Sequence, residues 1–491
     1  MIGPPGCGKT TALLDRVETA LAEGIDPDRI AVVTFTRKGA NEAAERAVKR
    51  FGFSRDDFPH FRTLHSLAFK HLGLTREQVM QPSNWHELGA SLGPFTFQNT
   101  HGSEEERAAP QGGLGDLCLA VYGLARATGR PLEETWRALQ RDPNRYGYPT
   151  TASMSWANVK TFADALSAYK LEKNLLDFTD FMDECQIVLD IDLMIVDEAQ
   201  DLTPQQWTFA RRVGMDAKEV LIGGDDDQSI FEWSGAAPDF LLSLRGSRRV
   251  LPVSYRLPRS VHALCNRVAD RIRRRMPKSW KARDAQGLVK FILSEEQVDL
   301  KKGTWLLLAR TRYLTQRLVT LCRRQGVVYK VQDDGWSNEH EQVRAVLSYE
   351  HLRRGDRISE RDARLAADYA SAVCNQSVDG EIGWDEVRWP FAGRPDWMTA
   401  LPLIGTSERE YIRALKRNHE SLTHTGRIII STIHGAKGGE ADNVLLLNQI
   451  SPIVRHAVEA GTDEEHRVWY VGLSRAREKL YVVEDQSGYK F

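Results

Sequence analysis

The chain carries at residues 3–11 the stretch Gly3-Pro4-Pro5-Gly6-Cys7-Gly8-Lys9-Thr10-Thr11. The stretch fits G-x-x-x-x-G-K-[ST], the pattern of a phosphate-binding loop. In such a loop the glycines let backbone N–H groups turn toward a β-phosphate. The ammonium of Lys9 then reaches the β- and γ-phosphates, and the hydroxyl of Thr10 holds Mg²⁺. We therefore assign all nine residues to nucleotide binding and expect a helix to begin directly after the loop.

The alternation of strand-like and helix-like segments predicts a parallel sheet around this loop. Residues 30–35 form a short β-branched run typical of a buried strand, and residues 38–51 are rich in the Ala, Glu and Arg of helices. Further strand-like runs stand at 193–196, 220–223, 250–253, 288–293, 304–309, 428–431, 444–447 and 480–483. This alternation favours an α/β protein with parallel sheets flanked by helices.

Bulk composition narrows the class of protein. The 491 residues suffice for about two to four domains, and 42% apolar with 27% charged residues are typical of a globular protein. The net charge of −1 gives no overall basic field, so any nucleic-acid site must be local. The six cysteines lack the paired spacing of a zinc module. We find neither a long apolar run nor a signal peptide, and we expect a cytoplasmic protein, bacterial or phage-encoded, with no membrane partner.

Two carboxylates, Asp197 and Glu198, follow directly after the apolar run 193–196. Phosphoryl transfer to water needs a metal ligand and a group that orients or deprotonates the water. Asp197 at the strand end suits the metal, and Glu198 suits the water. A solvated acidic turn is the alternative, but an apolar strand before the pair and a P-loop in the same chain favour the catalytic interpretation.

A set of motifs in fixed order resembles those of superfamily 1 DNA helicases of the UvrD/Rep/PcrA type. The motifs are 34–40 (TFTRKGA, similar to TFTNKA), 63–66 (TLHS, similar to TFHS), 175–178 (LLDF), 197–201 (DEAQD), 224–236 (GDDDQSIFEWSGA, similar to GDDDQSIYxWRGA), 254–257 (SYRL, similar to NYRS), 432–440 (TIHGAKGGE, similar to TIHxxKGLE) and 470–477 (YVGLSRAR, similar to YVAxTRA). Because they run in order through the whole chain, it is identified as a member of this family.

The resemblance implies two RecA-like domains, each with a mostly helical insertion. Residues 72–170 and 341–425 differ in composition from their surroundings and occupy the places of the family's insertions. The expected boundaries are 1–71 with 171–250 for RecA-like domain 1A, 72–170 for insertion 1B, 251–340 with 426–491 for RecA-like domain 2A, and 341–425 for a short 2B-like insertion.

The resemblance also implies that ATP and Mg²⁺ are the cofactors, bound between the two RecA-like domains. Gln228, four residues beyond Gly224, is expected to contact the γ-phosphate. Arg256 and Arg475, both assigned to the second domain, are expected to stabilise the charge of phosphoryl transfer as arginine fingers. The catalytic set is Lys9, Glu198, Gln228, Arg256 and Arg475, with Thr10 and Asp197 as metal ligands. Tyr255 is assigned to adenine, Glu440 to the ribose, and Arg37 to the nucleotide site in general.

Single-stranded nucleic acid is held by aromatic stacking and backbone contacts. Phe35 and Trp233 match the family's base-stacking positions, and Thr63, His65 and His434 match its polar contacts to the strand. For Phe35 the alternative is a place in the hydrophobic core. A basic stretch, residues 267–283, has eight Lys/Arg in seventeen residues. It fits phosphate contacts and a solvated helix face equally well.

We therefore expect an ATP-driven motor that moves 3′→5′ on single-stranded DNA and unwinds duplex DNA, acting as a monomer with no identified protein partner. Direction and unwinding come from the resemblance alone. The first rival is a translocase that strips proteins from DNA without separating strands. The second is a DNA-binding ATP switch that has lost hydrolysis. The family's adenine-reading segment before the P-loop is absent, so we expect either an amino-terminally incomplete chain or a trimmed form with relaxed base preference.

Overall fold

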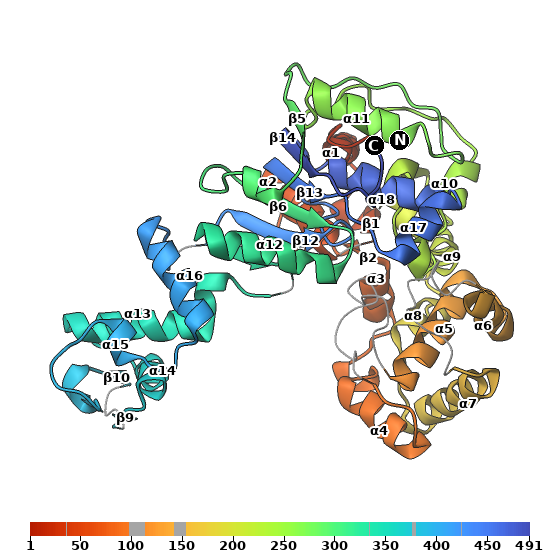
Figure 1. Cartoon of the computed structure of the whole chain (residues 1–491). Helices are drawn as coiled ribbons and strands as arrows, with labels where there is room; N and C mark the ends of the chain where they lie inside the picture. The colour runs from red at the N-terminus through yellow and green to blue at the C-terminus, as the bar shows by residue number, and fades with distance from the viewer. Residues whose placement is uncertain (36, 98–112, 142–153, 333, 376–379, 424) are drawn as a thin grey trace. The chain divides into compact units, whose positions relative to one another are not determined.

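The chain folds into two compact units, each built around a parallel sheet (Figure 1). The structure is a computed structural model, and it describes residues 1–491 except 36, 98–112, 142–153, 333, 376–379 and 424. Unit 1 comprises Met1–Ala285 and Pro452–Val471, and unit 2 comprises Gln286–Ser451 and Gly472–Phe491. The predicted fold class, α/β with parallel sheets flanked by helices, is confirmed.

The sheet of unit 1 has the strand order β2-β1-β3-β4, and all its pairs are parallel. The strands are β1 (Ile30–Thr34), β2 (Phe61–Thr63), β3 (Leu193–Asp197) and β4 (Glu219–Ile222). Every residue of β1 and β3 is buried, as expected for central strands covered on both faces. The register sets Thr34 opposite Asp197 at the carboxyl ends of these strands. Ligands of open α/β sheets bind beyond this edge.

The residues before the P-loop lie beside this sheet and are held by isolated bridges. Ile2 forms parallel bridges with Gly224 and with Val250. The N–H of Gly3 donates to the carbonyl of Gly224 at 3.0 Å, which fixes the start of the P-loop beside the end of β4. The predicted strand at 250–253 is wrong, since only isolated bridges form there, at Val250 and Val253. The intervening Pro252 has no N–H to give to a ladder.

Helices pack on both faces of the unit 1 sheet. Ile30 and Val32 of β1 face one core with α1 and α2, while Ala31 and Val33 face the other core with α3, α8 and α9. This division follows from the alternation of side chains along a strand. The helices of this unit outside its insertion are α1 (Lys9–Ala22), α2 (Arg37–Phe51), α3 (Leu64–His71), α8 (Phe178–Glu184), α9 (Pro204–Val213), α10 (Pro238–Ser243), α11 (Arg259–Ala269), α17 (Pro452–Glu459) and α18 (Asp463–Leu473), whose last two residues belong to unit 2.

The first insertion is helical and has its own core. Its helices are α4 (Pro82–Leu92), α5 (Leu114–Thr128), α6 (Leu132–Arg141) and α7 (Trp156–Lys173). Trp85, Phe97 and Phe162 are among the buried aromatic residues that pack between them. The predicted helices near 114–126, 131–140 and 155–173 are therefore present, each within two residues of its expected bounds.

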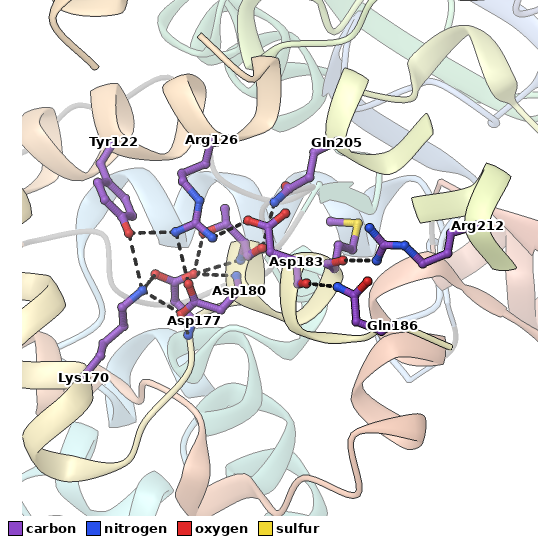
Figure 2. Close-up of polar contacts among 11 residues, drawn as sticks. Tyr122, Arg126, Lys170, Asp177, Asp180, Asp183, Gln186, Gln205 and Arg212 are labelled. Carbon is purple, nitrogen blue, oxygen red and sulfur yellow. Dashed lines mark hydrogen bonds and ion pairs between the residues drawn. The ribbon is translucent and has the colours of Figure 1, made fainter. Parts of the chain in front are cut away.

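A buried ionic cluster ties this insertion to α8 of the core (Figure 2). Lys170, near the end of α7, places its Nζ 2.7 Å from Asp177 Oδ2 and 2.6 Å from Asp180 Oδ2. Arg126 of α5 pairs with Asp180 at 3.1 Å and with Asp183 at 2.5 Å. Asp177 also caps α8, since its carboxylate accepts from the N–H groups of Thr179 and Asp180. Two insertion helices thus converge on one short helix.

The charge of this cluster depends on pH in a defined direction. Burial opposes the ionisation of Asp177, but the ammonium of Lys170, the hydroxyl of Thr179 and the charge of Arg126 together outweigh it, so the pKa of Asp177 lies below its usual value. A carboxyl whose folded pKa is depressed stabilises the fold above its unfolded pKa, about 4 for Asp. This contribution is lost as the pH falls from there through the folded pKa.

Unit 2 contains a larger sheet in the order β5-β14-β13-β6-β12-β7, also parallel throughout. Leu307, Ile430 and Leu445 lie in the core between this sheet and α12 (Arg312–Gln325). The strands are β5 (Leu288–Ile292), β6 (Trp305–Ala309), β7 (Tyr329–Val331), β12 (Ile428–Thr432), β13 (Ala441–Leu447) and β14 (Ala476–Val483).

The second insertion combines helices with two short antiparallel ribbons. The helices are α13 (Glu341–Arg354), α14 (Glu360–Ala370), α15 (Trp397–Ala400) and α16 (Thr406–Arg417). The ribbons pair β8 (Ile358–Ser359) with β10 (Glu381–Ile382) and β9 (Val373–Cys374) with β11 (Val387–Arg388). Tyr349 of α13 packs against Trp384 and Trp389, so the Trp/Pro-rich stretch of the sequence supplies a core.

The division between the compact units differs from the predicted domain boundary at residue 250. Residues 251–285 and 452–471 belong to unit 1. Hydrogen bonds join the segment after Val250 to the P-loop, from the N–H of Tyr255 to the carbonyl of Gly6 at 2.8 Å and from Ser254 Oγ to that of Pro5 at 2.7 Å.

Within the described residues, no helix is both long enough and apolar enough to span a bilayer.

We expect Lys170→Met to lower the free energy of unfolding by about 3–5 kcal/mol, because it removes the ammonium that pairs with buried Asp177. Lys160→Met on the same helix is the matched control, since Lys160 and Asp164 pair with side chains 60% and 68% exposed. For that pair we expect a change below about 1 kcal/mol. Urea unfolding of both variants measures the difference. Equal losses would contradict a special role for the buried cluster.

Candidate nucleotide and nucleic-acid site

The P-loop has the backbone conformation that its glycines predict. Gly6 and Gly8 have φ of 71° and 72°, in the left-handed region that glycine adopts at little cost. A side chain at Gly6 would collide with the Cβ of Arg256. Helix α1 begins at Lys9, directly after Gly8, so its free N–H groups point toward the loop. This is the arrangement that binds a phosphate at a helix N-terminus.

Lys9 joins the loop to the carboxylates at the end of β3. Its Nζ lies 3.2 Å from Asp197 Oδ1 and 2.6 Å from Glu198 Oε1. Thr10 Oγ1 lies 3.5 Å from Asp197 Oδ2. The structure therefore brings together four residues predicted from two separate motifs. Their functional roles stay predictions.

Burial controls the charge of this cluster. Burial raises the pKa of Asp197 above its usual value, and the ammonium of Lys9 only partly offsets it. For Lys9 the balance is reversed, because burial is outweighed by Asp197 and Glu198 and the pKa of the lysine rises. The lysine thus stays charged, and ionised Asp197 is held at a cost that an additional cation would relieve.

The donor set fits a magnesium ion. Mg²⁺ binds oxygen ligands, commonly one or two carboxylates completed by phosphate oxygens and water. The carboxylate of Asp197 and the hydroxyl of Thr10 are oxygen donors facing each other at the mouth of the P-loop. They supply the protein part of such a site.

Glu198 has a backbone conformation that glutamate rarely adopts. Its φ of 53° and ψ of 37° lie in the left-handed region. A non-glycine residue there costs on the order of 1 kcal/mol or more and persists where its surroundings impose it. The surroundings include Lys9 and Gln200, whose Nε2 donates to Glu198 Oε2 at 2.5 Å. The strained turn aims the predicted catalytic carboxylate at the P-loop lysine.

Gln228 belongs to a short turn that is bonded to the same cluster. Its Nε2 donates to Asp225 Oδ2 at 2.7 Å. The N–H of Asp225 donates in turn to Gln200 Oε1 at 3.0 Å. Gln200 is fully buried and contacts both Glu198 and Asp225, so it links the carboxylate motif to the Gln228 turn. No role was predicted for Gln200, although it lies inside the motif DEAQD at 197–201.

Tyr255 and Arg256 follow a serine that is bonded to the P-loop. Ser254 Oγ also accepts from the N–H groups of Arg256 and Leu257, so it fixes this turn. The ring of Tyr255 lies close to Gly8 and is 75% exposed, which leaves a face available for a base. Arg256 was predicted to come from the opposite domain, but it belongs to unit 1, the unit of the P-loop itself.

Unit 2 carries three of the predicted residues. Arg475 is buried and is oriented by the carbonyl of Gly439 at 3.3 Å and by Ser474 Oγ at 2.8 Å. Glu440 is exposed and accepts from Arg477 at 3.2 Å. His434 follows β12 and is half-buried. Arg37 begins α2 in unit 1, but its side chain lies outside the described residues.

The predicted stacking residues are connected by a third aromatic ring. Phe35 is 9% exposed and lies within the core, with its ring 5.6 Å from that of Phe231. Phe231 in turn lies 6.5 Å from Trp233, ring centre to ring centre. Trp233 is half-buried, and its backbone N–H donates to Glu464 Oε1 at 3.3 Å. The burial of Phe35 matches the core alternative, and Trp233 is the more accessible ring.

The other predicted strand contacts lie at the start of α3. Thr63 is buried and caps this helix, since its Oγ1 accepts from the N–H of Ser66 at 3.2 Å. The ring of His65 stands edge-on to Phe178, 6.1 Å away, next to the Asp177 of the ionic cluster. The cap explains a threonine at position 63 without any ligand.

Comparison with known proteins decides the family. The family model described as UvrD/REP helicase N-terminal domain matches residues 1–248. The model described as UvrD-like helicase C-terminal domain matches residues 410–487. The chain belongs to the UvrD/Rep helicase family. The resemblance that the ordered motifs indicated is thereby confirmed, and with it the use of a nucleotide that this family implies.

Relatives in the family are distant in sequence. The chain is 25% identical over 559 residues to ATP-dependent DNA helicase UvrD2 of Mycobacterium tuberculosis (strain ATCC 25618 / H37Rv), across 97% of this chain and 75% of that protein. It is 23% identical to the probable DNA helicase II homolog of Rickettsia conorii, across 99% and 90%. The structure of Arterivirus nonstructural protein 10 (helicase) aligns with a TM-score of 0.35 and 12% identity, and the chain covers 60% of its length. So weak a structural likeness carries no argument here.

The strain at Glu198 gives a test within this helicase fold. We expect Glu198→Gly to be more stable than Glu198→Ala by about 1 kcal/mol, because glycine adopts the left-handed conformation freely. Both variants lose the carboxylate and its bond to Lys9, so their difference isolates the backbone. Thermal or urea unfolding measures it. If alanine were as stable as glycine, the conformation of residue 198 would not be strained.

Proposed function

We propose that the chain is an ATP-driven motor on single-stranded DNA that unwinds duplex in the 3′→5′ direction. The observation that carries the proposal is the cluster of Lys9, Asp197 and Glu198, linked through Gln200 to the Gln228 turn, in a member of the UvrD/Rep helicase family. The curated relatives named above are DNA helicases, which supports DNA as the track. Their bacterial sources favour work in a bacterial cytoplasm.

The chain's own residues have distinct tasks in this proposal. The P-loop N–H groups and Lys9 bind the phosphates, and Glu198 orients and deprotonates the attacking water. Thr10 and Asp197 would hold Mg²⁺, which would neutralise phosphate charge. Gln228 contacts the γ-phosphate. We assign Tyr255 to the adenine, Glu440 to the ribose, Arg37 to the nucleotide site, and Arg256 and Arg475 to the charge that develops during transfer.

The nucleic-acid track is proposed to run over the aromatic residues that follow the Gln228 turn. Trp233 stands five residues after Gln228, and Phe231 lies between it and Phe35. A change in the position of Gln228 therefore has a short path to a stacking ring. Thr63, His65 and His434 are assigned to contacts with the strand.

Hydrolysis of ATP by the purified chain tests the motor. We expect single-stranded DNA to stimulate the rate strongly. We expect Glu198→Gln to lower kcat by about 100-fold or more, because it removes the general base. The malachite green assay for released phosphate measures both. A folded wild-type chain that binds DNA without hydrolysing ATP would favour the ATP switch instead.

Strand separation tests direction. We expect a duplex with a 3′ single-stranded tail to be unwound and one with a 5′ tail to stay paired. A blocked-end control on the same duplex, with streptavidin on a biotinylated end, detects a chain that displaces protein without separating strands. That outcome would replace the helicase by the translocase.

Trp233 is expected to hold a base by its aromatic face. Trp233→Leu should weaken binding of a fluorescein-labelled oligothymidine by about 1–3 kcal/mol, the usual contribution of one stacked base. Trp233→Phe keeps an aromatic face and should recover most of the affinity. Fluorescence anisotropy at constant salt measures both. Equal losses in the two variants would show that size and not stacking matters.

A further inference from the structure

Part of the basic stretch at 267–283 is buried. That part can be neither a solvated helix face nor an exposed phosphate-binding surface. The side chain of its Lys278 is completely buried, with 0% exposure. The ammonium lies 2.6 Å from Asp225, 2.6 Å from Asp226 and 2.7 Å from Asp227. Three consecutive carboxylates, themselves fully buried, therefore surround one lysine.

The neighbours of Lys278 complete the neutralisation. Arg275 pairs with Asp227 at 2.6 Å, and the N–H of Met276 donates to Asp226 Oδ2 at 2.8 Å. Buried carboxylates without a cation are strongly disfavoured, so this acidic turn requires the basic segment. Burial raises the pKa of Asp225 in spite of Lys278, whereas the pKa of Asp227 is lowered because Lys278 and Arg275 together outweigh its burial. Lys278 is the cation that pairs with Asp225.

Of these three aspartates, Asp225 is the one that is hydrogen-bonded to residues of the predicted nucleotide site. Its carboxylate accepts from Gln228 Nε2 at 2.7 Å, and its N–H donates to Gln200 Oε1. Its charge also acts on the P-loop, since burial and then Asp225 raise the pKa of the Cys7 thiol to about 12. Asp225 therefore links the three carboxylates to the P-loop and to the amide of Gln228.

We propose that Lys278 is a positioning residue for Gln228, acting through Asp225. The ammonium fixes the carboxylate of Asp225, and that carboxylate orients the amide of Gln228 toward the γ-phosphate. Lys278 also neutralises negative charge that would otherwise repel the incoming triphosphate. The inference rests on the proposed function, because it assigns Lys278 to the same hydrolytic site without any contact to the nucleotide.

A double-mutant cycle on ATP hydrolysis tests the assignment. We compare kcat and KM for ATP, with saturating single-stranded DNA, in the wild type, Lys278→Met, Gln228→Ala and the double variant. We expect Lys278→Met to lower kcat by about 10- to 100-fold, the usual effect of misplacing a reacting group. In the Gln228→Ala background the same substitution should change kcat less than about two-fold. Arg274→Met, in the same stretch but with a side chain 70% exposed, should leave kcat unchanged.

Each other result overturns the proposal or the function beneath it. Equal losses from Lys278→Met in both backgrounds would mean a role independent of Gln228, and an unchanged kcat would mean no role. If Lys278→Met does not fold, Asp225→Asn replaces it in the cycle with the same criterion, since Lys278 then keeps two carboxylates. A wild-type chain without ATPase activity overturns the proposed function itself. If Glu198→Gln abolishes ATP hydrolysis but Gln228→Ala leaves kcat unchanged, this inference is overturned and the proposed function stands.

Discussion

The ion pairs between Lys9 and the two carboxylates at the end of β3 are the contacts on which the rest of unit 1 depends. A buried ammonium needs anionic partners, and Asp197 and Glu198 are at hand because β3 ends opposite β1 at the carboxyl edge of the sheet. Lys9 can reach them because α1 begins there, after a glycine with positive φ. Loop, helix and strand are thus fixed to one another by charge at a single point.

The same solution recurs at two further places in unit 1. Lys170 holds the end of α7 against the start of α8, and Lys278 holds a basic segment against the Gln228 turn. In each case a lysine from one element is enclosed by aspartates from another. Removing one partner of such a contact strongly destabilises the fold, although the intact pair adds little net stability. These contacts therefore mainly specify how the elements meet. They attach the insertion to α8 and the basic segment to the acidic turn that contains Gln228.

Much of the fold was predictable because its signals are local. A few consecutive residues are enough to recognise the P-loop, the carboxylate pair and the apolar strands 30–35 and 193–196. The parallel pairing of the strands follows from their alternation with helices. The partners of buried charges were not predictable. Lys278 looked like part of a basic surface, since sequence alone does not show which cations fold inward. Strand β2 has only Phe61–Thr63, too few residues for a pattern, and Pro252 spoiled an apolar run that otherwise resembled a strand.

The ion pair between Lys9 and Glu198 couples two residues with different predicted roles. In the conformation described, the lysine that should receive the phosphates is already engaged with the carboxylate that should act on water. In the proposed function, a triphosphate entering the loop would replace these carboxylates around the Lys9 ammonium. This exchange would release Glu198 from the lysine, while Gln200 continues to donate to its other oxygen. Under this proposal, nucleotide binding and release of the general base are a single event.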